Sequence, residues 1–217
     1  MIFIRQEQTR YVISMMDMEL AVEGVRHGQK ECVIITEHET VYTAGRSTES
    51  MDFLKSSGKW ERYPIYHSKR GGRVTVHSPG QIVVYPIINL RFRGLSVTTY
   101  VSLLEEWIIN ALATFYVKSF RSDHGIGVWT PCIQSYGETV PSKIGFVGIR
   151  IVKGIASHGF CINVNNDLML FNDIIPCGLH DVRITSLKNI LGAEIEMETF
   201  IYSIIQSCPL RNNPPQY

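Results

Sequence analysis

The chain has 217 residues, of which 45% are hydrophobic and 19% charged, and its formal net charge is +1. These values are typical of a globular protein of one ordinary domain, and they exclude wholesale disorder. Because the net charge is near zero, the protein has no overall positive field that would attract a polyanion. The sequence also contains no recognised nucleic-acid-binding module, so nucleic acid is not an expected partner. No apolar stretch approaches the roughly 20 residues of a membrane helix, so no membrane association is predicted either.

The cysteines and the N-terminal residues indicate in which cellular compartment the protein is expected. The five cysteines are an odd number and none lies in a CxxC pair, while Arg5, Glu7 and Arg10 stand where a signal peptide would be apolar. This pattern favours reduced thiols and a cytoplasmic location. Since no linker, repeat or low-complexity segment interrupts the chain before its end, we expect a single domain over 1–210 and a short frayed tail over 211–217.

The pattern of apolar residues and turn formers predicts helices mixed with strands. The first helix has its apolar positions at Ile13, Met16, Leu20 and Ala21, and the second has an apolar stripe from Leu103 to Phe115. In chain order we expect a helix over 11–25, a strand over 31–36, a loop over 43–58, strands over 63–67, 73–77 and 82–90, a helix from Thr98 or Thr99 to Tyr116, strands near 126–129, 144–152 and 159–164, and helices near 185–191 and 198–207. The mixture indicates an α+β fold in which helices cover a mixed sheet.

Acidic residues are missing from two long segments. Residues 62–104 and 140–166 contain no Asp or Glu. If the two segments adjoin in the fold, they form a positive face that would suit an acidic partner or an anionic substrate. The alternative is an ordinary solvated surface. The basic residues expected on such a face are Lys69, Arg70, Arg73, Arg91, Arg93, Arg150 and Lys153.

Four clusters combine glycines with reactive side chains. Adjacent glycines allow a backbone to approach a ligand closely, and a cysteine between proline and glycine lies on a constrained loop, which favours an accessible thiol. The simpler interpretation of a lone cysteine is a small buried hydrophobic residue, and an isolated lysine is usually solvated. The clusters are Arg70–Gln81 with its Arg-Gly-Gly-Arg start and His77, Pro141–Arg150 with Lys143, Ser157–Asn165 with His158 and Cys161, and Ile174–Leu179 with Cys177.

Several common site types do not fit the sequence. No GxxxxGK[ST] phosphate loop is present, and Gly125-Ile-Gly127 lacks the third glycine of a dinucleotide fingerprint. His158 and Cys161 have ligand-like spacing but no second pair, so no metal site is expected. Cys177 with a histidine is reminiscent of a thiol protease, but no protease signature surrounds it.

Taken together, the order and spacing of the clusters resemble the octanoyltransferase family, the lipoyl(octanoyl) transferases also called lipoate-protein ligase B. The resemblance runs from about Ile35 to Leu187. It implies a biotin/lipoate-protein-ligase-like catalytic domain with a mixed β-sheet covered by helices. The matching blocks are Glu37-His38, Thr43–Arg46, Arg70–Gln81, Tyr85-Pro-Ile, Lys143-Ile, Gly148-Ile-Arg, His158-Gly-Phe, Asn163-Val, Asp167-Leu with Phe171, Pro176-Cys-Gly-Leu and Thr185-Ser-Leu.

The resemblance also implies a reaction. An octanoyl group moves from acyl carrier protein to a lysine of a lipoyl domain, in a 2-oxoacid dehydrogenase acyltransferase subunit or the glycine-cleavage H protein, as the first step of endogenous lipoate synthesis. Cys177 matches the nucleophile that carries the acyl thioester, and Lys143 matches the residue that lowers the cysteine pKa and relays protons. No cofactor or metal is implied. The residues that match the acyl-binding segments are Arg70, Gly71, Gly72, Arg73, Val74, Thr75, Val76, His77, Phe146, Val147, Gly148, Gly159, Phe160 and Cys161.

Local departures from the family pattern leave the acyl-chain preference open. Val76 stands where the family usually has tyrosine, Ser78 where it has glycine, and Phe146 where smaller residues are common. The second hypothesis is an ATP-dependent lipoate- or biotin-protein ligase, which shares the fold but needs no nucleophilic cysteine. The third is a non-catalytic binder of acyl carrier or lipoyl domains. Cys177 and Lys143 favour the transferase over both.

Overall fold

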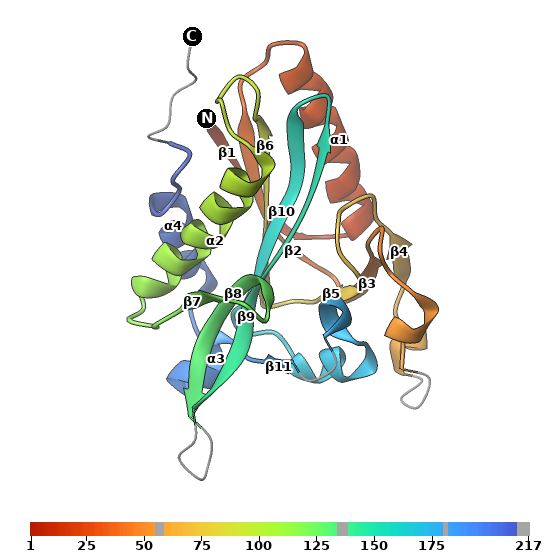
Figure 1. Cartoon of the computed structure of the whole chain (residues 1–217), viewed down its shortest axis with the longest axis vertical. Coiled ribbons are helices and arrows are strands. Elements are labelled where there is room, and N and C mark those ends of the chain that lie inside the picture. Colours follow the sequence, from red (N-terminus) through yellow and green to blue (C-terminus); the bar gives the residue numbers. More distant parts are fainter. Residues whose placement is uncertain (55–58, 134–138, 180–181, 212–217) are drawn as a thin grey trace.

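The computed structural model describes residues 1–54, 59–133, 139–179 and 182–211. Within these residues the strands form two sheets (Figure 1). The main sheet has the strand order β1-β2-β6-β10-β9-β8-β7, with β11 paired to β9, and the small sheet has the order β4-β3-β5. The strands are β1 (Ile2–Thr9), β2 (Cys32–His38), β3 (Val41–Ala44), β4 (Ile65–His67), β5 (Thr75–His77), β6 (Gln81–Asn89), β7 (Phe120–Ser122), β8 (Gly125–Ile133), β9 (Thr139–Val152), β10 (Ile155–Asn163) and β11 (Arg183–Ile184).

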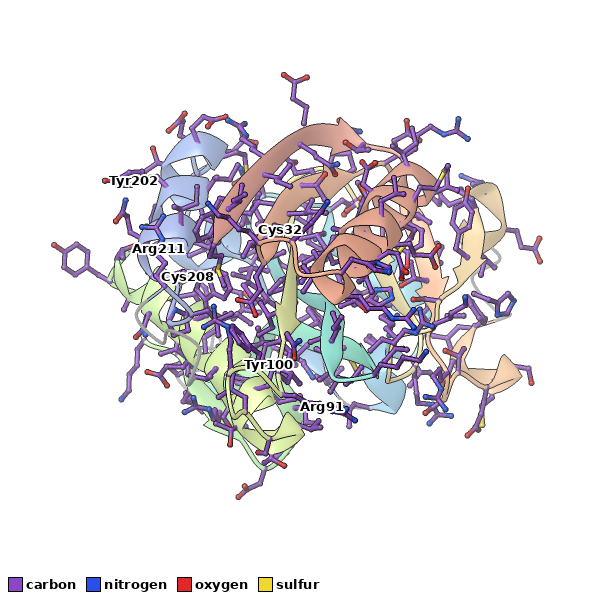
Figure 2. The ribbon with its side chains drawn as sticks, turned by 90° about the horizontal axis from the view of Figure 1, so that it is seen from above. Cys32, Arg91, Tyr100, Tyr202, Cys208 and Arg211 are labelled. Atoms are coloured by element: carbon purple, nitrogen blue, oxygen red, sulfur yellow. The ribbon has the colours of Figure 1, made fainter. Side chains whose placement is uncertain are left out.

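Helices lie on both faces of the main sheet. Helices α2 and α4 cover one face, whereas α1 and the small sheet lie on the other (Figure 1). Figure 2 looks down on this arrangement from above, with Tyr100 and Cys208 on the side of α2 and α4. The α-helices are α1 (Tyr11–Arg26), α2 (Val97–Ala113), α3 (Leu187–Leu191) and α4 (Met197–Gln206), and the short 3-10 helices are η1 (Ser50–Asp52), η2 (Lys59–Arg62), η3 (Leu168–Asp173) and η4 (Pro176–Gly178).

Strand β6 shows how the sequence divides the core into two layers. Successive side chains of a strand point to opposite faces, and β6 is apolar on both. Its residues Ile82, Val84 and Ile88 pack with α2 and α4, whereas Val83, Tyr85 and Ile87 pack on the side of α1. The sheet is mixed, because β1–β2 and β9–β11 pair in parallel while the other main-sheet neighbours are antiparallel. This architecture confirms the predicted α+β fold.

Most predicted elements occur within a few residues of their expected limits, and the differences have local causes. β1, β3, β7 and β11 are not predicted, and β3 overlaps the predicted loop over 43–58. Helix α2 begins at Val97 rather than near Thr99, because Ser96 Oγ accepts the N–H of Thr99 at 3.1 Å and so caps the helix. Of the predicted tail over 211–217, only Arg211 lies within the described residues.

Helix α1 buries residues other than the apolar ones that predict it. Ile13, Met16 and Leu20 are 44%, 61% and 72% exposed, whereas Tyr11 and Met18 are buried on the side of β6 and β10. The helix carries apolar side chains around most of its circumference. Their spacing therefore predicts a helix but does not indicate which side of it faces the sheet. The position of Tyr11 matters for the site, because it brings a phenol ring over the sheet.

Candidate active site

Cys177 lies in the short turn η4, which follows η3 beneath the small sheet (Figure 1). Its φ of 57° falls in the left-handed region that few non-glycine residues adopt. Its N–H donates to the carbonyl of Val74 at 3.3 Å, which ties the turn to the segment before β5. At Gly178, φ is 72° and a Cβ would lie 2.4 Å from Cδ of Arg73, so the turn requires glycine there.

Lys143, near the start of β9, is buried next to this cysteine. It is 1% exposed, although lysine is almost never fully buried without a partner. Its Nζ donates to the carbonyl of Ile126 at 2.7 Å and lies 4.0 Å from Sγ of Cys177. The rings of Trp129 and Phe146 lie 5.1 and 5.4 Å from Nζ, within the range of cation–π attraction. Among the described residues no carboxylate forms an ion pair with Lys143.

Gly127 makes room for the lysine side chain. Its φ is 122°, and a Cβ at this position would lie 2.5 Å from the carbonyl oxygen of Gly145 and 2.8 Å from Cε of Lys143. Its N–H donates to Oε1 of Glu105 at 2.8 Å, and Arg121 pairs with the same carboxylate at 3.2 Å. The Gly125-Ile-Gly127 sequence, which fits no nucleotide-binding pattern, therefore supports the position of the ammonium group.

A pocket of about 520 Å³, its mouth included, opens beside Cys177 on the α1 side of the sheet. Strands β6, β9 and β10 form its floor, and the segment over 70–77 forms a side wall. The lining residues are Tyr11, Arg70, Gly72, Arg73, Thr75, His77, Val83, Tyr85, Phe146, Val147, Gly148, His158, Gly159, Phe160, Cys161 and Cys177. The structure thus brings together residues from all four sequence clusters.

Three residues of the expected acyl-binding segments lie outside this wall. Val74 and Val76 are buried and pack in the core beneath the pocket, because alternate residues of an extended segment point away from it. Gly71 contributes its N–H to the carbonyl of Ile149 at 2.9 Å and so fixes the segment to β9.

Sequence reasoning missed four residues of the wall, namely Tyr11, Val83, Tyr85 and His158. Tyr11 begins the predicted first helix, far in sequence from the clusters, and no motif there indicates a site. Val83 and Tyr85 lie in a strand whose apolar pattern predicts burial on both faces. His158 is the exception, because it belongs to the third cluster and precedes the glycine of the pocket floor.

Arg70 is a buried cation that organises the side wall. Its two terminal nitrogens donate to the carbonyls of Thr43, Gly71 and Arg73 at 2.7 to 3.0 Å, and one also donates to the Thr43 hydroxyl at 2.9 Å. Burial lowers the pKa of its guanidinium. Arg70 therefore stabilises the conformation of the glycine-rich loop. Because it is buried, its guanidinium is not available to contact a partner at the surface.

Two histidines and a cysteine of the wall are kept neutral. Burial lowers the pKa of His77 and of His158 to about 3, and it raises the pKa of the Cys161 thiol to about 12. His77 donates from Nδ1 to Oε1 of Gln81 at 2.6 Å, which fixes its tautomer. Near neutral pH these groups add no charge to the pocket, which suits an apolar ligand.

The two acid-free segments form only part of the expected basic face. Arg70 and Lys143 are buried, and Arg93 is buried in an ion pair with Glu31 at 2.5 Å. Arg91 and Lys153 are exposed at the far end of the sheet, where β9 turns into β10 (Figure 2). Lys69 and Arg150 line one surface groove, and Arg150 and Lys153 line another, so part of the expected common face is present, without the buried Arg70 and Arg93.

Comparisons with known proteins agree with this geometry. Residues 11–208 match the family model of the lipoyl protein ligase A/B catalytic domain. The chain is 40% identical over 193 residues to an octanoyltransferase of Rickettsia bellii, a match that covers 88% of each chain. The chain belongs to the octanoyltransferase family. It is therefore related to transferases, and the matched residues include both Cys177 and Lys143.

Solved structures show that octanoyltransferases share their fold with ligases. A bi-partite lipoate protein ligase of Thermoplasma acidophilum aligns with a TM-score of 0.66 at 14% identity, over 95% of this chain and 81% of that one. A biotin protein ligase of Aquifex aeolicus, in complex with biotin and ATP, aligns with a TM-score of 0.52 at 14% identity, over 95% of this chain and 67% of that one. The expected biotin/lipoate-protein-ligase-like fold is thus confirmed.

Two negative findings concern the described residues alone. No helix among them is long and apolar enough to cross a membrane. No group of three or more His, Cys, Asp and Glu side chains in this part of the chain is arranged to hold a metal ion.

Proposed function

We propose that the chain transfers an octanoyl group from octanoyl-acyl carrier protein to a lysine of a lipoyl domain through a thioester on Cys177. The observation that carries the proposal is the 4.0 Å approach of the Lys143 ammonium to the Cys177 sulfur at the wall of a narrow pocket. A buried cation beside a thiol stabilises its thiolate, which is the nucleophilic form. The octanoyltransferase relatives support the same reaction.

In the first half-reaction the Cys177 thiolate attacks the carbonyl carbon of the donor thioester. A new carbon–sulfur bond forms, the bond to the carrier's thiol breaks, and the departing thiolate takes a proton. Lys143, whose Nζ lies 4.0 Å from Sγ of Cys177, can supply the proton. One thioester replaces another, so the step needs no nucleotide.

In the second half-reaction the amine of the acceptor lysine attacks the acyl-enzyme. The carbon–nitrogen bond of an amide forms, Cys177 leaves as a thiolate, and the amine loses one proton. The neutral Lys143 amine left by the first half-reaction can accept that proton, which restores the ammonium. The energy released by converting a thioester to an amide makes the transfer favourable.

The acyl chain occupies the pocket in this proposal. The floor offers the backbone of the paired glycines Gly148 and Gly159 and the aromatic ring of Phe146. Burial of the chain's methylenes against these groups contributes about 0.8 kcal/mol each. The lipoyl-domain acceptor belongs to a 2-oxoacid dehydrogenase acyltransferase subunit or to a glycine-cleavage H protein.

The test separates this reaction from that of an ATP-dependent ligase, which has the same fold. Purified protein is incubated with octanoyl-acyl carrier protein, and its intact mass is measured before an apo lipoyl domain is added. We expect a gain of one octanoyl group on Cys177 and transfer that survives EDTA and apyrase. Strict dependence on ATP would favour the ligase, and a protein that forms neither adduct nor product would be a binder.

A further inference from the structure

A second cavity adjoins the acyl pocket at its end away from the reactive pair. It measures about 550 Å³, its mouth included, and lies between α1 and residues 66–69. Tyr11 and His158 line both cavities, whereas Cys177 lines only the first. The two side chains therefore stand between the acyl pocket and this groove.

The pairing of β9 with β10 gives the direction of the pocket. Phe146 is opposite Cys161, and Gly148 is opposite Gly159, both in the floor of the acyl pocket. Two residues further along β9, Arg150 lines the second cavity. A chain that starts at Cys177 and follows the strands thus meets Tyr11 and His158 before it reaches the groove.

Contacts with α1 and β6 hold His158 in a strained backbone conformation. Its φ is 56° inside strand β10, which is costly for a residue with a Cβ. Its N–H donates to the sulfur of Met18 on α1 at 3.2 Å, and its ring meets the ring of Tyr85 edge-on at 6.1 Å. These contacts turn the imidazole toward the end of the pocket rather than letting it follow the regular pleat.

Tyr11 is held just as firmly from the opposite side. Its ring stacks on His77 with centroids 6.2 Å apart and lies 5.5 Å from the ring of Tyr66. Its ring also meets the ring of His38 at 5.3 Å, and Tyr11 is 6% exposed. A buried ring packed against three other rings acts as a barrier rather than as a mobile surface residue.

We infer that Tyr11 and His158 form the end wall of the acyl pocket and set the longest acyl chain that Cys177 can carry. The inference rests on the proposed function. The groove between α1 and residues 66–69 is the space that longer chains enter once the wall is opened. Because both rings are neutral near neutral pH, the wall stops the chain by volume and not by charge.

Two substitutions open the wall. His158→Gly removes the imidazole at a positive φ that glycine adopts without strain, and Tyr11→Ala removes the phenol. Carrier proteins loaded with eight-, twelve- and sixteen-carbon chains are the donors, and kcat/KM for transfer to an apo lipoyl domain is measured with each. In both variants we expect the twelve-carbon to eight-carbon ratio of kcat/KM to rise about tenfold or more, since each additional buried methylene strengthens binding.

Matched variants distinguish an opened wall from a loosened fold. Tyr11→Phe keeps the ring, so it should not raise the twelve-carbon to eight-carbon ratio above that of the wild type. Met15→Trp, which fills the groove beyond the wall, should leave the wild-type profile unchanged but cancel the gain in His158→Gly. A wild-type protein that acylates Cys177 while both opened variants retain its chain-length profile would overturn the inference. Absence of any adduct with every donor would instead overturn the proposed function.

Discussion

At the scale of single residues, the site contains two thiols in very different surroundings. Cys177 lies beside an ammonium group, whereas Cys161 is buried in the same pocket with its pKa raised to about 12. We expect iodoacetamide to modify Cys177 and to leave Cys161 untouched in the folded protein, as peptide mass mapping would reveal. Cys177→Ala should abolish the acyl adduct and transfer, whereas Cys161→Ala should retain both. An adduct that persists in Cys177→Ala would place the nucleophile elsewhere.

Lys143 has a charge and a transferable proton, and substitution can separate the two. Lys143→Arg keeps a cation beside the sulfur but cannot lose a proton readily, so we expect wild-type labelling of Cys177 and transfer slowed by about a hundredfold or more. Lys143→Ala should slow both the labelling and the transfer. Labelling rates with iodoacetamide and single-turnover transfer rates measure the two effects. Equal transfer by Lys143→Arg and wild type would contradict a proton relay.

Three buried histidines make the stability of the fold depend on pH. Burial lowers the pKa of His38 to about 4 and that of His77 and of His158 to about 3, against about 6.5 in an unfolded chain. The unfolded state therefore binds more protons below pH 6.5, so stability is full above that pH and falls as the pH is lowered toward 3 to 4. Urea denaturation should show this loss, and His158→Gly should reduce its slope by up to about 1.4 kcal/mol per pH unit. A slope identical to that of the wild type would show that His158 is not buried in its neutral form.

At the scale of elements, the site depends on backbone conformations that the sequence predicts only in part. The Pro176-Cys-Gly178 turn is visible as a constrained loop, and its left-handed cysteine fits that expectation. Gly127 of β8 is different, because a larger residue at this position would clash with the lysine side chain on the neighbouring strand. Such a contact between strands depends on register, which the pattern of one strand alone does not specify.

A Cβ at Gly127 should disturb both the backbone of the neighbouring strand β9 and the Lys143 side chain. Gly127→Ala places a methyl group 2.5 Å from the carbonyl oxygen of Gly145 and 2.8 Å from Cε of Lys143, whereas Gly192→Ala, also at a positive φ, meets nothing within 4 Å. We expect both variants to lose about 1 kcal/mol of stability from the strained backbone, with a larger loss in Gly127→Ala. Transfer should fall sharply only in Gly127→Ala. Urea denaturation and transfer assays on the pair measure this, and equal activities would show that Gly127 has no part in positioning Lys143.

At the scale of the whole molecule, the sequence predicts the α+β class and the helices and strands of its centre. It predicts them well because β6 and α2 are long, apolar and regularly patterned. The edge strand β1 is missed, since its residues are mostly exposed and mix charged with apolar side chains. The end of the acyl pocket is also missed, because Tyr11 reaches it only through the packing of α1 on the sheet.

The arrangement of exposed charge at molecular scale leads to a revised prediction about carrier docking. In the proposed reaction an acidic acyl carrier protein brings its thioester to Cys177, so a basic docking residue should lie near the start of β9. Arg183 on β11 is exposed and pairs in register with Ser142, the neighbour of Lys143. Lys153 is equally exposed but lies about 30 Å away along β9.

Charge reversal at these two positions tests which end of the molecule receives the carrier. For Arg183→Glu we expect the KM for octanoyl-acyl carrier protein to rise about threefold to fivefold at low salt, the scale of one exposed ion pair. The difference should shrink as salt is added, and a small octanoyl thioester should be used at the wild-type rate, because it makes no contact with the docking surface. Lys153→Glu should behave as the wild type with both donors. A larger effect from Lys153→Glu than from Arg183→Glu would move the docking surface to the β9–β10 turn, and the carrier's arm would then have to span the length of the sheet to reach Cys177.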